Sequence, residues 1–156
     1  MLQRLSGSQM LLFKDKINYK APNGNGFTAH LDAPAYNHIC KVEHLTINIA
    51  IDDATPANGC VEVVVDSHKM NVTMIGHNID PKWDEAADWT PIPLASGDLL
   101  VFGSHLAHRS AANKTTGSRA SVYATYNSIL DGENLHAKYY AHRRQEFPPD
   151  HGLMHA

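Results

Sequence analysis

Short β-rich segments separated by turn residues constrain the fold of this chain more than any other feature. They are rich in Val, Ile, Thr and Tyr, and Gly, Pro, Asn or Asp bounds most of them. The segments expected to form strands are 11–20, 27–32, 45–51, 60–65, 99–103 and 119–128, with a short strand or bend at 105–110 and a terminal helix at 135–145. From 66 to about 93 we expect a long irregular excursion that Trp83 and Trp89 anchor on the body of the domain. Regularly spaced strands with polar turns predict an all-β core, an antiparallel sandwich or jelly roll, with few helices around it.

The length and charge of the chain limit its domain organisation and its partners. At 156 residues it matches one ordinary domain, so we expect a single domain over 1–156, with a core at about 11–130 and a C-terminal extension at 131–156. The formal net charge of −3 gives no reason to expect nucleic acid or an anionic membrane as a partner. No apolar stretch approaches the ~18 residues that a transmembrane helix needs.

The cysteines and the first residues point to the cytoplasm. Cys40 and Cys60 lie in apolar, strand-like surroundings, and their spacing matches no zinc pattern. Residues 1–10 contain no sustained apolar run and do not resemble a signal peptide. We therefore expect both cysteines to be reduced core residues of a cytoplasmic protein.

Two side chains that often bind metal ions stand together in the segment 27–32. His30 and Asp32 are two residues apart, so on a strand both would point to the same face. An imidazole and a carboxylate suit Fe(II), Mn or Zn, and a second His from elsewhere would complete a facial triad that leaves one face of the metal open. Alone the pair is a weak signal, because it occurs by chance and also fits a surface pair near a turn.

A candidate third ligand follows about 75 residues downstream. His108 comes after the hydrophobic strand 99–103, and Arg119 stands eleven residues beyond it. Arginine grips a carboxylate with two hydrogen bonds and keeps its charge, and Ser110 supplies a hydroxyl nearby. An open metal face with a buried Arg fits a dicarboxylic 2-oxo acid, although Arg119 in isolation fits an ordinary surface residue better. His105 is the rival third ligand, but it lacks an Arg at this interval.

The chain resembles the phytanoyl-CoA dioxygenase (PhyH-like) family of Fe(II)/2-oxoglutarate-dependent oxygenases. The matching stretches are 12–20, the Gly-rich turn into 30–36, 58–64, 67–69, 97–102, 108–110 and Arg119. This ordered set spans most of residues 12–150, so its joint specificity is high.

The resemblance implies a fold and an iron site. The fold is a double-stranded β-helix, a cupin-like jelly roll, and the implied Fe(II) ligands are His30, Asp32 and His108. Arg119 and Ser110 would hold the distal carboxylate of 2-oxoglutarate. Asn18 matches a position that contacts the cosubstrate, and Lys16, which shares its face of the strand, is expected to do likewise.

The expected pocket wall comes from four further residues. Phe27 and Tyr36 match pocket-lining positions of the family, and Tyr36 is a candidate substrate contact, although both also fit plain core aromatics. Thr46 and Asn48 are polar where a core strand would be apolar. We therefore expect them to point into the pocket, Thr46 toward the cosubstrate and Asn48 toward the substrate.

The activity implied is oxidation of a C–H bond of a small organic metabolite, most often hydroxylation, with O₂ and 2-oxoglutarate consumed and succinate and CO₂ released. The segment 139–150 resembles members that act on small polar metabolites, including aminophosphonates. Family members usually carry a longer N-terminal region, which looks short or missing here and would leave one sheet face exposed for a second copy to cover. Two alternatives stay open: a cupin-type metalloenzyme that does not use 2-oxoglutarate, and an inactive or partner-dependent fragment.

Overall fold

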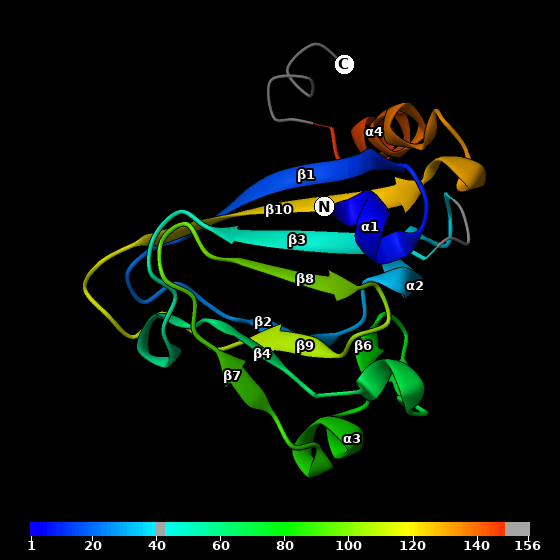
Figure 1. Ribbon diagram of the computed structural model, residues 1–156. Helices are drawn as coiled ribbons and strands as arrows, with labels where there is room; N and C mark the ends of the chain where they lie inside the picture. The colour runs from blue at the N-terminus through cyan, green and yellow to red at the C-terminus, as the bar shows by residue number, and fades with distance from the viewer. Residues whose placement is uncertain (40–42, 149–156) are drawn as a thin grey trace.

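Two antiparallel sheets face each other in the computed structural model, which describes residues 1–39 and 43–148 (Figure 1). The four-stranded sheet has the order β1-β10-β3-β8, with β1 at Met10–Lys20, β10 at Arg119–Ser128, β3 at Leu45–Ala50 and β8 at Leu99–Gly103. The six-stranded sheet has the order β5-β6-β2-β9-β4-β7, with β5 at Met74–Ile75, β6 at Asn78–Ile79, β2 at Phe27–His30, β9 at His108–Ser110, β4 at Val61–Val63 and β7 at Thr90–Ile92. This arrangement confirms the predicted jelly-roll core.

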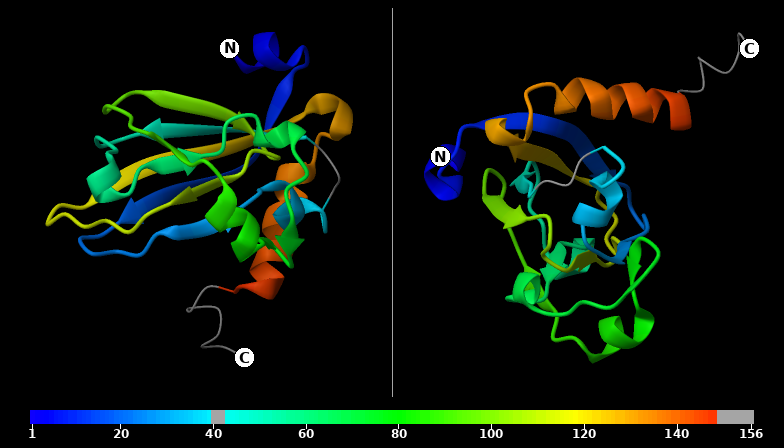
Figure 2. Two further views of the ribbon diagram at one scale, coloured as in Figure 1. Left: turned by 90° about the horizontal axis from the view of Figure 1, so that it is seen from below. Right: turned by 90° about the vertical axis from the view of Figure 1, so that its right-hand side faces the viewer.

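The helices are short and lie at the periphery. They are α1 at Leu2–Ser6, α2 at Ala33–Tyr36, α3 at Pro81–Ala86 and α4 at Leu135–Glu146. Seen along the strands, the sheets curve around a common interior, and α4 lies outside against β1 (Figure 2). The described helices include none with the length and apolar character needed to cross a membrane.

The observed elements differ from the predicted ones at two points. The strand expected at 27–32 ends at His30, because Asp32 adopts helical angles (φ −75°, ψ −35°) ahead of α2, in which Pro34 fixes its own φ. The stretch 70–93, expected to be irregular, contributes three short strands and α3. Trp83 and Trp89 anchor it, as predicted, on a cluster of small apolar residues: Ala29, Val64, Ile79 and Ala107.

The four-stranded sheet turns its polar face inward. Along β10 the inward side chains are Arg119, Ser121, Tyr123, Thr125 and Asn127, and all but Tyr123 are buried. The register places Thr46 opposite Thr125 and Asn48 opposite Tyr123, so β3 adds two more inward polar residues. A buried polar face lacks the driving force of apolar burial, and its polar groups need partners. The interior of this sheet is therefore built as a binding cavity.

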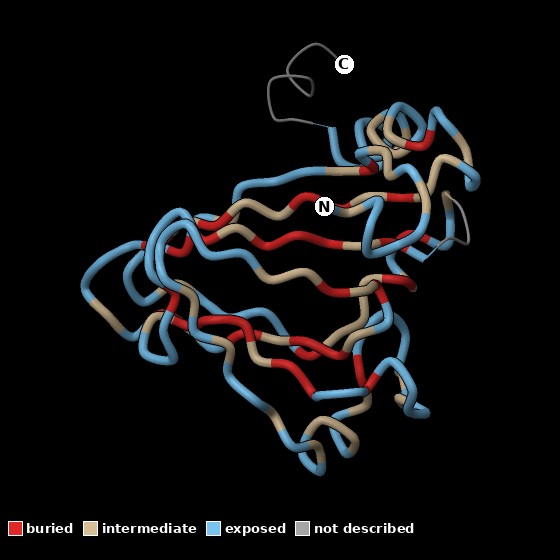
Figure 3. The backbone as a smooth tube through the Cα atoms, in the orientation of Figure 1, coloured by how far each residue is buried: buried red, intermediate tan, exposed pale blue. Residues whose placement is uncertain are grey.

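The outer face of the same sheet is largely apolar and partly exposed. Ile17 and Tyr19 on β1 are each 68% exposed, and Leu99 on β8 is 46% exposed, whereas Ile47 and Ala124 at its centre are buried. Figure 3 shows exposed segments along β1, while β3 is mainly buried and β10 is buried or half-buried. Part of the sheet face that was expected to be exposed is therefore exposed among the described residues.

Of the two cysteines, Cys60 is buried and unpaired among the described residues, as expected. Burial raises the pKa of its thiol, which keeps it protonated and unreactive at neutral pH. Cys40 and the last part of the C-terminal extension, from 149 onward, lie outside the described residues.

Candidate functional site

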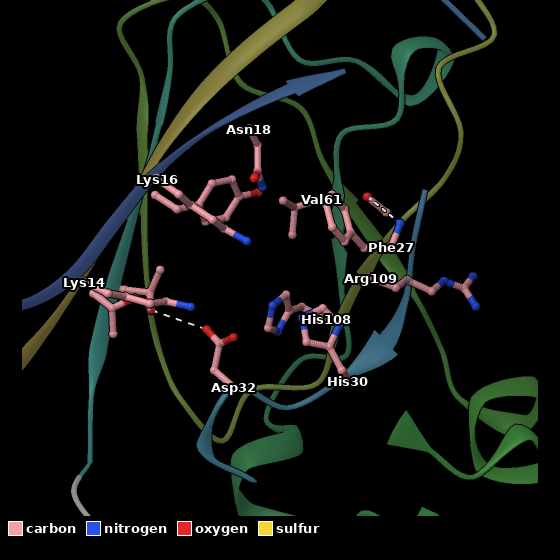
Figure 4. A pocket seen from close by; sticks show the side chains of 13 residues that line it. Lys14, Lys16, Asn18, Phe27, His30, Asp32, Val61, His108 and Arg109 are labelled. Atoms are coloured by element: carbon pink, nitrogen blue, oxygen red, sulfur yellow. Dashed lines mark hydrogen bonds between the residues drawn. The ribbon is translucent and has the colours of Figure 1, made fainter. Parts of the chain in front are cut away.

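Three ligand side chains meet at one end of the six-stranded sheet. One nitrogen or oxygen atom from each of His30, Asp32 and His108 lies within 4.8 Å of the others. His30 and His108 are register partners on β2 and β9, and their ring centroids are 4.2 Å apart. Asp32 reaches the same point from the bend before α2 (Figure 4). Neighbouring strands and one backbone bend thus assemble the predicted triad.

Backbone carbonyls fix the orientation of both imidazoles. Nδ1 of His30 lies 2.7 Å from the Thr28 oxygen, and Nδ1 of His108 lies 3.0 Å from the Leu106 oxygen. A carbonyl only accepts, so each Nδ1 carries a proton, and in the neutral ring each Nε2 keeps a free lone pair. This tautomer, locked by a hydrogen bond at the other nitrogen, is the form in which histidine binds a metal ion.

The electrostatics of the triad favour its metal-binding protonation state. Burial, together with the neighbouring His30, lowers the pKa of His108 to about 4. Burial would raise the pKa of Asp32, but His108, Lys14 and His30 outweigh that effect and hold it below its ordinary value. At neutral pH His108 is therefore neutral and Asp32 ionised, as a cation requires of its ligands.

Most of the predicted pocket residues line the same cavity as the triad. They are Lys16, Asn18, Phe27, Thr46 and Ser110. The Thr46 hydroxyl donates to Asp32 Oδ2 at 3.5 Å and lies 3.0 Å from the Thr125 hydroxyl. Thr46 thus steadies the carboxylate of the triad, while β1 supplies the opposite wall through Lys16 and Asn18.

Arg119 lines an adjoining cavity that shares Asn18, Phe27, Ser110 and Tyr123 with the first. Its buried guanidinium donates to the Gly59 carbonyl and to the Ser121 hydroxyl. Lys20, also buried, donates to the same Gly59 carbonyl at 3.2 Å and to the Ser110 hydroxyl at 3.0 Å. Gly59 itself has φ +74°, and a Cβ there would collide with the Ala111 carbonyl.

The residues present fit both iron and a dicarboxylic 2-oxo acid. Two imidazoles and one carboxylate are the donor set of a mononuclear Fe(II) site with open positions. Lys20 and Arg119 are two buried cations on one carbonyl, and neither forms a salt bridge with a described residue. Burial and the nearby Arg119 lower the pKa of Lys20 to about 8. An anion bound between them would relieve this uncompensated charge.

Two predicted substrate residues lie behind the cavity wall. Tyr36 packs edge-on against Phe13, with ring centroids 5.2 Å apart, and does not line the cavity. Asn48 donates to the hydroxyl of Tyr123 at 3.1 Å, and Tyr123 forms the wall in its place. The rival ligand His105 is exposed and borders a different cavity, which favours His108.

The sequence interpretation did not single out Lys14, Lys20, Tyr123 and Thr125, all of which border one of the two cavities. The alternation that placed Lys16 and Asn18 on one face of β1 also includes Lys14 and Lys20. The same alternation, counted along β10 from Arg119, places Tyr123 and Thr125 on the inward face.

His44 gives the fold a pH dependence that can be tested apart from the metal site. It is fully buried between Phe13 and Tyr36, and no described residue bonds to either ring nitrogen. Burial lowers its pKa to about 4, so below pH 6.5 the unfolded chain binds a proton that the folded chain excludes. We expect the free energy of unfolding to fall as the pH drops from 6.5 toward 4. His44 should account for about 1 kcal/mol of this loss at pH 5.

The matched variant is His44→Phe, which keeps an aromatic ring between the two neighbours and cannot titrate. Urea unfolding at pH 7 and pH 5 measures both proteins. The variant is expected to lose less stability than the parent between the two pH values. An identical loss in both would rule out His44 as the titrating group.

Comparisons with known proteins agree with this geometry. A family model described as phytanoyl-CoA dioxygenase (PhyH) matches residues 2–121. The chain is 41% identical over 145 residues to methylphosphonate hydroxylase of Gimesia maris, covering 92% of this chain and 55% of that protein. It is 40% identical over 155 residues to dioxygenase lolE1 of Epichloe uncinata, covering 99% and 60% respectively.

The fold also matches a solved structure. The structure of EctD from S. alaskensis with 2-oxoglutarate and 5-hydroxyectoine aligns with a TM-score of 0.72 at 22% identity, over 83% of this chain and 48% of that one. At this identity the likeness shows the fold. The chain thus spans between 55% and 60% of the length of the two sequence relatives described above.

Proposed function

Because this chain belongs to the phytanoyl-CoA dioxygenase family, we propose that it is an Fe(II)- and 2-oxoglutarate-dependent dioxygenase that oxidises a C–H bond of a small organic metabolite. The main support is the triad of His30, Asp32 and His108, which opens onto a cavity continuous with a buried pair of cations. Metal site and carboxylate site lie side by side, as a chelating 2-oxo acid with a second carboxylate needs.

The protein's part in this reaction is to hold groups in place. His30, Asp32 and His108 would hold the iron, and Arg119 with Lys20 would hold the far carboxylate of 2-oxoglutarate. Bound iron and 2-oxoglutarate together supply O₂ activation, with succinate and CO₂ as by-products and one oxygen atom available for the substrate. Thr46 orients the Asp32 carboxylate, and Tyr123, itself held by Asn48, walls off the cavity from the rest of the interior.

The substrate proposed is a small, polar metabolite. The cavity beside the triad is small, with a volume of about 40 Å³, which favours a small substrate over a bulky one. The relative from Gimesia maris is named for a small substrate, methylphosphonate. Tyr36 and Asn48 are proposed to shape the pocket indirectly, through the core and through Tyr123.

The experiment that tests the function is coupled succinate release. Purified protein with Fe(II), 2-oxoglutarate, O₂ and a panel of small polar substrates should form succinate in proportion to oxidised product. Substrate turnover that persists without 2-oxoglutarate would support the cupin-type alternative. Calorimetry that detects no metal binding would instead support an inactive fragment, or one that needs a partner.

We also propose that a second copy of the chain covers the outer face of the four-stranded sheet, and that the protein resides in the cytoplasm. Ile17 and Tyr19 lie in the open on this apolar face, and burying them against a copy would remove them from water. Sedimentation velocity should show a dimer, and Ile17→Glu should shift it to monomer without loss of metal binding. A parent protein that stays monomeric at high concentration would contradict the dimer.

A further inference from the structure

Two lysine side chains enter the metal cavity from β1 without an acidic partner of their own. Figure 4 shows the ammonium groups of Lys14 and Lys16 pointing toward Asp32 and His108. Among the described residues neither lysine forms a salt bridge. Asp32 is the only carboxylate in the described lining of the cavity, and a metal ion would already claim it.

Aromatic rings hold both ammonium groups in place. Nζ of Lys14 lies 4.4 Å from the centre of the Tyr36 ring. Nζ of Lys16 lies 5.4 Å from the Phe27 ring and 5.5 Å from the Tyr123 ring. The face of an aromatic ring attracts a cation and positions it, but adds no net negative charge. The ammonium groups of Lys14 and Lys16 are thus held in position, and their charges remain available to an anionic ligand.

A third cation near the cavity shows the contrast. Arg109 bonds to Glu62 at 2.6 Å and to Asp84 at 2.7 Å, and its guanidinium stacks on Trp89. Figure 4 shows its side chain leading away from the cavity. The charge of Arg109 is therefore satisfied by the protein, whereas those of Lys14 and Lys16 are not.

The charge balance of the loaded site would stay positive. A divalent metal ion adds two charges next to the lysines, which Asp32 and the chelating carboxylate of a 2-oxo acid offset, so the charges of the two lysines would remain uncompensated. The far carboxylate of a 2-oxo acid is accounted for by Arg119 and Lys20 in the adjoining cavity. Positive charge in a partly desolvated cavity attracts an anion strongly.

Resting on the function proposed above, we propose that Lys14 and Lys16 bind the anionic head of the substrate, a small doubly charged oxyacid such as a phosphonate. Two ammonium groups match two negative charges. Both lysines line the same cavity as His30, Asp32 and His108, so a head group held by them would bring the adjoining carbon into that cavity.

The test measures binding, so it does not depend on turnover. Methylphosphonate, acetate and neutral acetamide are titrated by calorimetry into the protein, first metal-free and then loaded with Zn(II) and 2-oxoglutarate. The variants are Lys14→Met and Lys16→Met, which keep chain length and remove charge, and Lys16→Arg, which keeps charge. Lys82→Met, at an exposed lysine in α3, is the matched control.

We expect the parent protein to prefer methylphosphonate over acetate, and acetate over acetamide. Each Met variant should weaken methylphosphonate binding about tenfold or more, while Lys16→Arg and Lys82→Met stay within about threefold of the parent. Affinity for 2-oxoglutarate should change little in any of them. Loss of 2-oxoglutarate binding along with methylphosphonate binding would reassign the lysines to the cosubstrate and overturn the proposal.

The outcome also separates this proposal from the proposed function. A parent protein that binds Zn(II) and 2-oxoglutarate but shows no charge preference among the probes would overturn the substrate proposal alone. A parent protein that binds no metal, yet binds methylphosphonate through both lysines, would overturn the dioxygenase and leave the anion site standing.

Discussion

Replacing His108 by Ala is expected to lower the affinity of the protein for Fe(II) or Mn(II) at least ~100-fold and to abolish metal-dependent turnover. His108 is one of the three proposed metal ligands among the described residues, and the bond from its Nδ1 to the Leu106 carbonyl orients its Nε2 for the metal. Removing it leaves His30 and Asp32, which cannot fix a facial site. Calorimetric titration of Mn(II) measures the change directly.

The control is His105→Ala, three residues earlier, in the turn that precedes β9. His105 is exposed and borders a different cavity, so its loss should leave metal affinity within about twofold of the parent. Unfolding curves show whether each variant is folded. Full activity in the His108 variant, or loss of metal binding in the His105 variant, would contradict the assignment of His108 as the third ligand.

Sequence alternation predicted much of the site because the site is built on strands. Side chains two apart on β1 share a face, which brought Lys16 and Asn18 to the cavity wall. The spacing of His108, Ser110 and Arg119 likewise matched their places on β9 and at the start of β10. Side chains two residues apart share a face of the sheet wherever the strand is continuous.

Prediction was less complete where the backbone leaves the strand or where tertiary pairing decides which face is inside. Asp32 reaches the triad through a bend, and the short helix that follows turns Tyr36 into the core beside Phe13. Lys14 and Lys20 were overlooked because a lysine on a strand usually faces water. Only the packing of the two sheets against each other shows that the polar face of β1 points inward.

That inverted sheet also links the fold to its chemistry. Apolar residues on the outer face and polar residues on the inner one reverse the usual order, and the inner polar groups bond to one another, as in the pair Thr46 and Thr125. Such a network keeps the cavity open against hydrophobic collapse and orients the groups around it. The same arrangement leaves an apolar, partly exposed outer face, and the dimer is proposed because a second copy would bury it.

Replacing Arg119 by Met is expected to weaken 2-oxoglutarate binding by about 100-fold, because a charge-assisted bidentate contact with the distal carboxylate is lost. Arg119 also donates to Gly59 and Ser121, so a change in packing alone would lower affinity too. The cosubstrate analogue 2-oxopentanoate separates the two causes, since it chelates a metal in the same way but has no distal carboxylate. The parent protein should bind it about as weakly as the Arg119→Met variant binds 2-oxoglutarate. The Arg119→Met variant should bind 2-oxoglutarate and 2-oxopentanoate with similar affinity. If the substitution instead lowers the affinity for each ligand by the same factor, so that the variant still prefers 2-oxoglutarate, Arg119 acts only through the structure.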